Sequence, residues 1–476
     1  MSTFSRLGKN TALIMVGNAS SKLIALLMLP LYTSWLSVDD YGTTDIITVY
    51  STLLLGIVSG CIAEAIFVIP KNQSEIEKVK YFSSGLYYLI GAFFSSAILL
   101  FVLFVVLIEF NKNNSFTDNI VGIYFVLISN IMFVYAQQFC RSIDKIANYS
   151  IAGIIVTLST AVFSLIFIPP YGVNGFIFAT VASYFVATLY IIVSSRLFHY
   201  VDCCGFDKDK LKELLSYSIP LIPNSIMWWL VSASNRPVLE MTCGLGAIGI
   251  LAVAGKFPGM LNVLLNAFNS SWVISVLEEY GKGGFDVFYN KGIKWFCFIL
   301  FTAAFGITIF GKWIIAFFTS DISYHDSWIF MPMLAFSTVL SCLAGLIGSV
   351  YSAVKKSKYY FYTSIWSALS AVFFNIILIP IWGLWGAVFA NTLSMLVMLL
   401  SRTYYSMKYV KITAVKNIFV NSLFFILIFV QTILNQSLMG FIVNIFVLLV
   451  YFIVNRSYLH KLNMLVVNIL SKTIRA

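Results

Sequence analysis

The stretch that decides the fold is 149–183, YSIAGIIVTLSTAVFSLIFIPPYGVNGFIFATVAS, which recurs at 360–394 as YFYTSIWSALSAVFFNIILIPIWGLWGAVFANTLS. The two copies align without gaps, and both carry a proline followed by a glycine three positions later, PPYG at 169–172 and PIWG at 380–383. Such a pair ends one helix and permits a reversal before the next. Each copy therefore predicts two apolar helices joined by a tight turn.

The composition around this repeat is that of a membrane protein. Of 476 residues, 60% are apolar and only 10% are charged, whereas soluble proteins carry about 25% charged residues. Since a span needs roughly 20 apolar residues, we predict fourteen spans. This excludes a soluble enzyme with one anchor, and also an outer-membrane barrel with short alternating strands. The predicted spans are 10–36, 44–69, 82–108, 119–140, 149–168, 173–195, 215–236, 246–276, 293–318, 327–354, 359–379, 384–401, 415–434 and 438–455.

The offset between the copies defines a larger repeat of six spans. A weaker echo pairs Gly42 with Gly249 at the starts of the second and eighth spans. We expect an all-α polytopic protein with six-helix lobes at 1–205 and 206–410, and two additional helices at 411–476. An even number of spans gives both lobes the same orientation, so a pseudo-two-fold axis should run along the membrane normal. Such lobes predict a central cavity and transport by alternating access.

The basic residues predict the orientation. The net charge is +11 from 30 Lys and Arg, and basic residues collect in cytoplasmic loops. With both termini in the cytoplasm, nearly all of them fall on that side, and only Lys112, Arg236 and Lys312 fall opposite. The charge excess is thereby explained by topology, and no nucleic-acid partner is expected. We predict a multi-pass membrane protein with both termini in the cytoplasm.

Ionisable residues inside the spans are the candidate functional groups, because an isolated charge there costs about 2.5–3.5 kcal/mol. They are Lys22, Glu64, Arg236, Glu240 and Lys256. Lys22 and Lys256 have no acid within helical reach, which favours an anionic ligand. Glu64 is expected to couple an ion or to neutralise Lys22. Glu240 is spaced to pair with Arg236, although the intervening proline disfavours a continuous helix.

Polar side chains cluster in the same spans. Candidate ligand groups are Asn18, Asn224, Asn262 and Asn266, and Asn269 shares a helical face with the last two. Near span ends, Arg141, Lys312 and Arg402 suit snorkelling to the surface. No phosphate-binding GxxxxGK[ST] loop and no Cys/His cluster occurs in the sequence, so we expect no catalytic residues, metal or cofactor.

Short motifs throughout residues 9–410 resemble bacterial polysaccharide flippases of the Wzx, O-antigen type. In the first lobe these are GNASSK at 17–22, LPLYT at 29–33 and DYG at 40–42; in the second, SIPLIPN at 218–224, AGKF at 254–257 and SW at 271–272. The resemblance implies the multidrug/oligosaccharidyl-lipid/polysaccharide exporter fold with a cationic cavity. It matches Lys22, Arg236 and Lys256 to basic residues of that cavity, whereas Asn235 stands where many relatives have Asp.

The resemblance also implies the substrate. It is an undecaprenyl-diphosphate-linked oligosaccharide, a lipopolysaccharide precursor, moved from the cytoplasmic to the periplasmic leaflet of the lipid bilayer that forms the bacterial inner membrane. Expected partners are a polysaccharide polymerase and a chain-length regulator. The two C-terminal helices look like those that provide a groove for the lipid tail in related lipid flippases.

Other functions remain open from sequence. A drug/cation antiporter of the same fold should have an acidic lumen, whereas this one is predicted to be basic. A peptidoglycan-precursor flippase would share the diphosphate. A membrane glycosyltransferase or polymerase needs a long external catalytic loop, and no loop on that side is long.

Overall fold

The computed structural model describes residues 21–109, 115–202 and 205–459. Throughout these ranges the regular structure is helical, and eleven helices are long and apolar enough to cross a membrane. The chain divides into two compact units, 1–252 with 318–324, and 253–317 with 325–476. The predicted boundaries at 205 and 410 rest on the sequence repeat and stay predictions.

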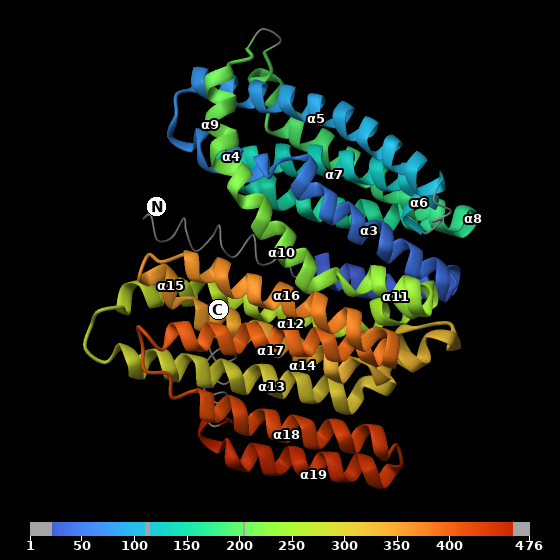
Figure 1. The fold of residues 1–476 in the computed structure, drawn as a ribbon, viewed down its shortest axis with the longest axis vertical. Helices are drawn as coiled ribbons and strands as arrows, with labels where there is room; N and C mark the ends of the chain where they lie inside the picture. Colours follow the sequence, from blue (N-terminus) through green and yellow to red (C-terminus); the bar gives the residue numbers. More distant parts are fainter. Residues whose placement is uncertain (1–20, 110–114, 203–204, 460–476) are drawn as a thin grey trace, which may run out of the picture. The chain divides into compact units, whose positions relative to one another are not determined.

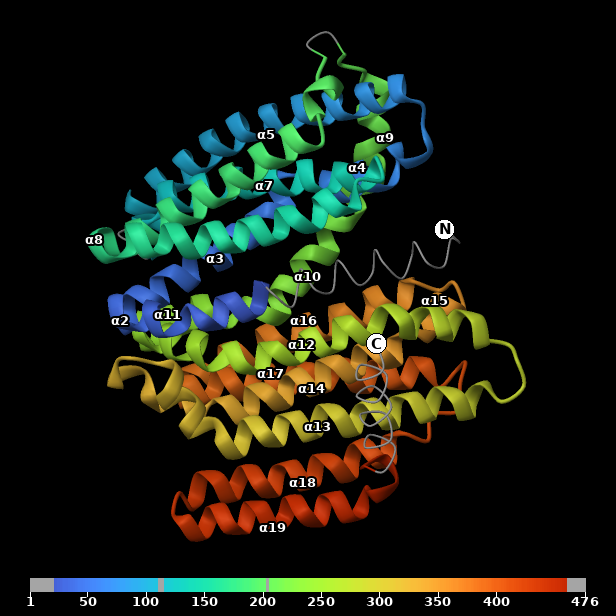
Figure 2. The same ribbon diagram turned by 180° about the vertical axis from the view of Figure 1, so that it is seen from behind.

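In its described residues, the first unit combines long helices with several short ones (Figure 1). Helices α7 and α8 lie side by side in Figures 1 and 2 and pack against each other. The elements are α2 (Leu29–Trp35), α3 (Val38–Val58), α4 (Ile62–Val68), η1 (Pro70–Asn72), α5 (Glu75–Glu109), α6 (Ser115–Asp118), α7 (Ile120–Ser142), α8 (Ile146–Ser194), η2 (Leu197–Tyr200), α9 (Lys208–Ser218), η3 (Ile219–Leu221), α10 (Ile222–Ala233) and α11 (Asn235–Cys243). Helix α12 (Leu245–Glu279) begins in this unit and continues into the second.

The second unit is built on long helices and ends in a hairpin. Helix α17 packs against both α14 and α16, and α18 packs against α19 (Figure 1). The elements after α12 are α13 (Phe285–Phe318), η4 (Ile322–Ile329), α14 (Met331–Gly348), α15 (Val350–Ala353), α16 (Lys358–Trp382), α17 (Leu384–Ser406), α18 (Val415–Leu434) and α19 (Leu438–Val454). η4 starts in the first unit and ends in this one.

The sequence repeat is a repeat of backbone conformation. Gly172, inside α8, has φ 52° and ψ −124°, and Gly383, between α16 and α17, has φ 56° and ψ −127°. Residues that carry a side chain rarely adopt such backbone angles, so each turn requires glycine. The two halves of α8 therefore correspond to the predicted spans 149–168 and 173–195, and the helix pair is built in the same way in both copies.

A second glycine of the repeat permits close packing within each pair. A Cβ at Gly175 would overlap the carbonyl of Phe167, and one at Gly386 would overlap the carbonyl of Leu378. Phe167 and Leu378 occupy equivalent positions of the two copies. The PxxG-xx-G spacing thus encodes both the reversal and the contact after it.

The weaker echo of Gly42 and Gly249 also has a structural basis. A Cβ at Gly42 on α3 would overlap the carbonyl oxygen of Leu245, and one at Gly249 on α12 would overlap that of Val38. The contact is reciprocal, because each glycine faces the residue four positions before the other. The first turns of α3 and α12 consequently cross at backbone distance.

Helix α3 begins and ends at recognisable local signals. Ser37 and Asp40 form a capping box, in which each side chain accepts a hydrogen bond from the other's backbone N–H, satisfying donors that the first turn leaves free. At its end Gly60 and Cys61 both have positive φ. The predicted span 44–69 is therefore two helices, α3 and α4, separated by this break.

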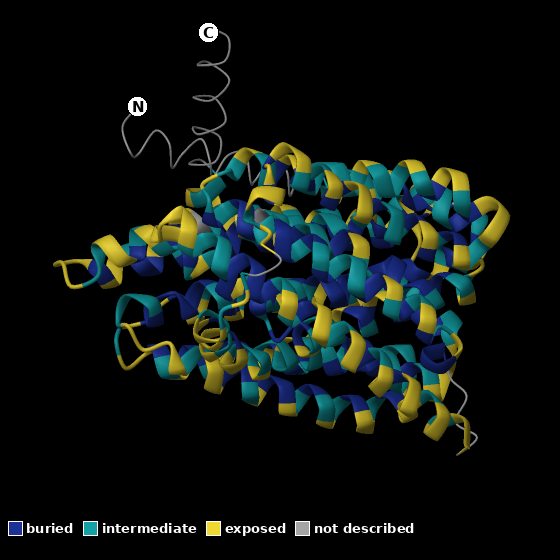
Figure 3. Ribbon diagram, turned by 90° about the horizontal axis from the view of Figure 1, so that it is seen from above, coloured by how far each residue is buried: buried dark blue, intermediate teal, exposed yellow. Residues whose placement is uncertain are grey.

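Apolar side chains face outward on the long helices, as lipid requires. Phe94, Ile98 and Phe101 on α5 are each at least 66% exposed, and Phe373 and Ile376 on α16 are nearly as exposed. Figure 3 shows exposed residues recurring along the helices beside buried ones. A water-soluble protein rarely exposes so much apolar surface. Together with α19, a shorter apolar helix, the described helices account for the predicted spans from 44–69 onward. The first predicted span, 10–36, lies partly outside the described residues.

Candidate functional site

Arg236, in the first turn of α11, is held by an ion pair that the sequence did not predict. Its Nε donates to Asp45 Oδ2 on α3 at 3.1 Å, and the side chains of Arg236 and Asp45 are 19% and 21% exposed. Its Nη1 donates to Asn235 Oδ1 at 2.8 Å and to the Ser232 carbonyl at 3.3 Å. Asn235, the position that departs from the family pattern, thus orients the guanidinium without adding a second negative charge.

The guanidinium keeps unused donors. Arginine has five N–H groups, and the three contacts above use only those on Nε and Nη1. Within the part of the chain that the structure describes, the two hydrogens of Nη2 have no partner. Asp45 therefore fixes the position of Arg236 while leaving one edge of its planar fork able to bind an anion.

Glu240 does not supply the carboxylate for Arg236, although its spacing allowed it. Its Oε1 accepts a hydrogen bond from the backbone N–H of Ser115, the first residue of α6, at 2.6 Å. The acid that pairs is Asp45, which lies 191 positions away in sequence. A signal was present: Asp45 lies inside the predicted span 44–69, where an ionised carboxylate needs a partner.

Further contacts join α10 and α3 beside this pair. The indole Nε1 of Trp229 donates to the carbonyl of Val49 at 2.9 Å, and the Ser225 hydroxyl lies where a Cβ on Gly56 would be. Asn224, one of the predicted ligand groups, lies half-buried on the same helix. The predicted residues Arg236 and Asn224 therefore lie on consecutive helices, α11 and α10, and both helices contact α3.

The remaining predicted residues are placed individually. Lys22 is exposed in the helical stretch 21–27 that precedes α2, and Glu64 is exposed in the first turn of α4. In the second unit, Lys256 is exposed on α12. Asn18 lies outside the described residues. The binding roles of these residues stay predictions.

The asparagine stripe of α12 has the expected periodicity. Asn262 and Asn266 are exposed, and Asn269 is half-buried. The Oδ1 of Asn262 accepts a weak hydrogen bond from Cys342 Sγ on α14 at 3.8 Å. Helix α12 continues through Pro258 without a break, so Lys256 and the stripe belong to one helix.

Arg402 was expected to snorkel, and this is wrong. The residue is 3% exposed, its Nε donates to Thr363 Oγ1 at 3.4 Å, and its guanidinium carbon lies 5.4 Å from the ring centroid of Tyr360. Tyr360 and Thr363 are both on α16, so the side chain crosses to the neighbouring helix instead of extending to the surface. Cation–π contact helps a desolvated guanidinium to remain inside the protein.

The fold defines an all-α, multi-pass membrane protein whose helix pairs are duplicated. Residues 7–276 match the family model described as "Polysaccharide biosynthesis protein". As the match covers more than half of the chain, the protein belongs to this polysaccharide biosynthesis family. No curated protein sequence matches the chain.

Solved structures confirm the fold at low sequence identity. The lipid II flippase MurJ in an inward closed conformation superposes with a TM-score of 0.70 at 16% identity, covering 95% of this chain and 99% of that one. An inward-facing multidrug resistance MATE transporter of the MOP superfamily gives 0.67 at 15%, covering 82% and 95%. A MOP superfamily transporter from Pyrococcus furiosus, described as having a binding pocket of reversed polarity, gives 0.58 at 16%, covering 84% and 95%. The predicted exporter fold is therefore confirmed.

Proposed function

We propose that the protein is a flippase that moves an undecaprenyl-diphosphate-linked oligosaccharide from the cytoplasmic to the periplasmic leaflet of the bacterial inner membrane. The observation that carries the proposal is a basic residue inside a span, Arg236, with its Nη2 edge unused, in a member of a polysaccharide biosynthesis family. Transport proceeds by alternating access through a cationic central cavity. Both termini are cytoplasmic, and a polymerase and a chain-length regulator act on the product.

The proposed roles follow from the chemistry of the substrate. A diphosphate is doubly anionic and needs cationic donors away from bulk water, and the planar fork of arginine suits phosphate oxygens. Arg236 supplies such a fork, and Lys22 and Lys256 supply point charges. Asn224, Asn262, Asn266 and Asn18 offer amide groups for sugar hydroxyls. The polyprenyl tail remains in lipid.

The membrane potential supplies a driving force of the right sign. An interior-negative potential of about 100 mV favours outward movement of each negative charge by about 2.3 kcal/mol. Two charges therefore gain roughly 5 kcal/mol. Glu64 is the residue through which a counter-ion would act if transport is instead an antiport.

The test is flipping by purified protein in proteoliposomes. A fluorescent undecaprenyl-diphosphate oligosaccharide is incorporated, and its exposure to an added lectin is followed with the potential and ion gradients imposed separately. Arg236→Gln should slow flipping roughly ten- to a hundredfold, the range that corresponds to one charge-assisted hydrogen bond, and Arg236→Lys should slow it less. Lys282→Gln is the matched control, because the Lys282 side chain is 58% exposed in the turn after α12 and its ion pair among the described residues is with Glu279, three positions earlier.

The outcomes separate the candidate functions. Wild-type rates in Arg236→Gln, Lys22→Gln and Lys256→Gln, at equal reconstituted amounts, would refute the cationic mechanism. Transport of a cationic dye without lipid flipping would indicate a drug/cation antiporter. A preference for lipid II over the oligosaccharide substrate would identify a peptidoglycan-precursor flippase. Cleavage or elongation of the glycan would indicate an enzyme.

A further inference from the structure

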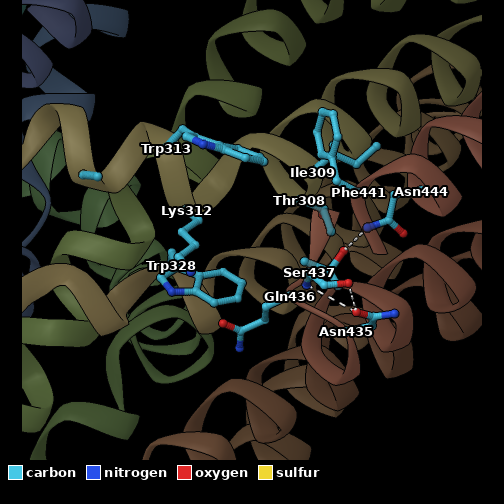
Figure 4. Close-up of a pocket in the computed structure, with 12 residues that line it drawn as sticks. Thr308, Ile309, Lys312, Trp313, Trp328, Asn435, Gln436, Ser437, Phe441 and Asn444 are labelled. Carbon is cyan, nitrogen blue, oxygen red and sulfur yellow. Dashed lines mark hydrogen bonds between the residues drawn. The ribbon is translucent and has the colours of Figure 1, made fainter. Parts of the chain in front are cut away.

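A pocket of about 250 Å³ lies where the hairpin of α18 and α19 meets the end of α13 and η4, and all the residues that line it belong to the second unit (Figure 4). Figure 4 shows Lys312, Trp328 and Gln436 on one side and Phe441 and Asn444 on the other. This pocket is separate from the residues proposed to bind the transported lipid. The transport proposal does not use Lys312, which was expected only to snorkel.

Part of the pocket is fixed by the fold. The Thr432 hydroxyl donates its hydrogen to the Ile428 carbonyl at 2.7 Å, so it can only accept from the Asn444 Nδ2, at 2.9 Å. In the turn, Asn435 Oδ1 accepts from the Ser437 hydroxyl at 2.6 Å. These bonds hold α18, the turn and α19 in one geometry. The four residues therefore shape the pocket.

The groups that remain are mainly donors, and the acceptors beside them are the amide oxygens of Asn444 and Gln436. Among the described residues, neither the Lys312 ammonium, nor the indole N–H of Trp313 or Trp328, nor the Gln436 amide has a hydrogen-bond partner, and no carboxylate lies within 4 Å of Lys312 Nζ. None of the described residues that line the pocket is acidic. A cluster of a cation and neutral donors without an acid is complementary to an anion.

The surroundings are those of a lipid headgroup. Trp313 is 54% exposed, and Leu434 and Leu438 at the ends of the hairpin are 79% and 77% exposed. The rings of Trp313 and Phe441 meet edge-to-face at 5.1 Å. Lys312 Nζ lies 6.0 Å from the ring centroid of Trp328. Tryptophan and lysine flanked by apolar side chains are typical of the membrane–water interface.

We propose that this pocket binds the headgroup of an anionic phospholipid that carries hydroxyl groups, the phosphatidylglycerol class. The phosphodiester accepts from Lys312 and the indole N–H groups, the headgroup hydroxyls bond to Gln436, and the acyl chains lie on the exposed apolar residues. An ethanolamine headgroup would bring its ammonium beside Lys312, which is repulsive. Inorganic phosphate would leave the aromatic and apolar walls without a partner. By the predicted topology the lipid belongs to the periplasmic leaflet.

The experiment measures lipid retention by the full-length protein in detergent. Native mass spectrometry is run with phosphatidylglycerol and with phosphatidylethanolamine of identical acyl chains. Lys312→Gln should retain about fivefold less phosphatidylglycerol, the factor that corresponds to about 1 kcal/mol per basic residue near an anionic surface. Its retention of phosphatidylethanolamine should not change. Lys312→Arg and the control Lys282→Gln should behave as wild type.

Thermal unfolding of the same samples completes the test. Because Lys312 is exposed and has no acidic partner among the described residues, the lipid-free Lys312→Gln protein should unfold at the wild-type temperature. Added phosphatidylglycerol should stabilise only proteins with a cation at 312. Equal retention by wild type and Lys312→Gln, equal retention of the two lipids by wild type, or equal stabilisation by inorganic phosphate would each overturn the proposal.

Discussion

Replacing Asp45 by Asn tests whether Arg236 is held by charge. Asparagine keeps the shape of the side chain and an oxygen that accepts from Arg236 Nε, so the change removes the negative charge alone. Breaking a fully buried ion pair by removing one partner costs about 3–5 kcal/mol. Here the side chains are 21% and 19% exposed, and the hydrogen bond is retained. We therefore expect a loss of about 1–3 kcal/mol in the free energy of unfolding.

The assay is a double-mutant cycle on the purified protein. Unfolding is measured for wild type, Asp45→Asn, Arg236→Gln and the double variant. If the two charges interact, the double variant is less destabilised than the sum of the single ones, by about 1–2 kcal/mol. Glu278→Gln, at an exposed site on α12, is the acid-to-amide control and should change stability by less than about 0.5 kcal/mol.

Strict additivity in this cycle would refute the assignment of Asp45 as the partner of Arg236. If the free energy of unfolding of Asp45→Asn equalled that of the wild type, the expected loss of about 1–3 kcal/mol would be refuted. Additivity would leave Arg236 oriented, among the described residues, by Asn235 and the backbone carbonyl of Ser232.

Three other predictions concern local structure. Gly383→Ala should lose about 1–3 kcal/mol of stability, because its φ of 56° and ψ of −127° strain any side chain; Gly91→Ala, in open space on α5, should be neutral or slightly stabilising in the same unfolding assay. Gly249→Ala should lower the thermal midpoint, whereas Gly255→Ala, whose Cβ would meet nothing within 4 Å, should not; equal midpoints would contradict the close crossing of α3 and α12. Asp207→Ala should destabilise the first turn of α9 and increase its hydrogen exchange, since Asp207 accepts from two backbone N–H groups there. The backbone N–H of Lys210 contributes most to holding the pKa of Asp207 below its usual value. The protection from exchange is therefore present above the unfolded pKa and is lost as pH falls through the lower folded pKa. If the wild type remained better protected than Asp207→Ala at still lower pH, this explanation would be wrong.

Periodicity and turn chemistry were sufficient to predict the fold class. Apolar runs of span length can satisfy their backbone in lipid only as helices, and the repeated Pro and Gly residues determine where the chain reverses. Gly172 and Gly383 consequently have nearly the same φ and ψ. These features depend only on residues that are close together along the chain, so they can be predicted from the sequence alone. The break at Gly60 and Cys61 was missed, because the apolar composition continues through it.

Partners distant in sequence were decided only by the tertiary structure. Helical spacing made Glu240 a candidate partner for Arg236, but the packing of α11 against α3 placed Asp45 there instead. Position near a span end suggested snorkelling for Arg402, yet the neighbouring α16 buries it. Lys312 was expected to behave in the same way, and the α18–α19 hairpin makes it part of a pocket. A charged side chain inside a membrane needs a partner, and the sequence shows which residues these are. Which partner it finds depends on which helices pack together.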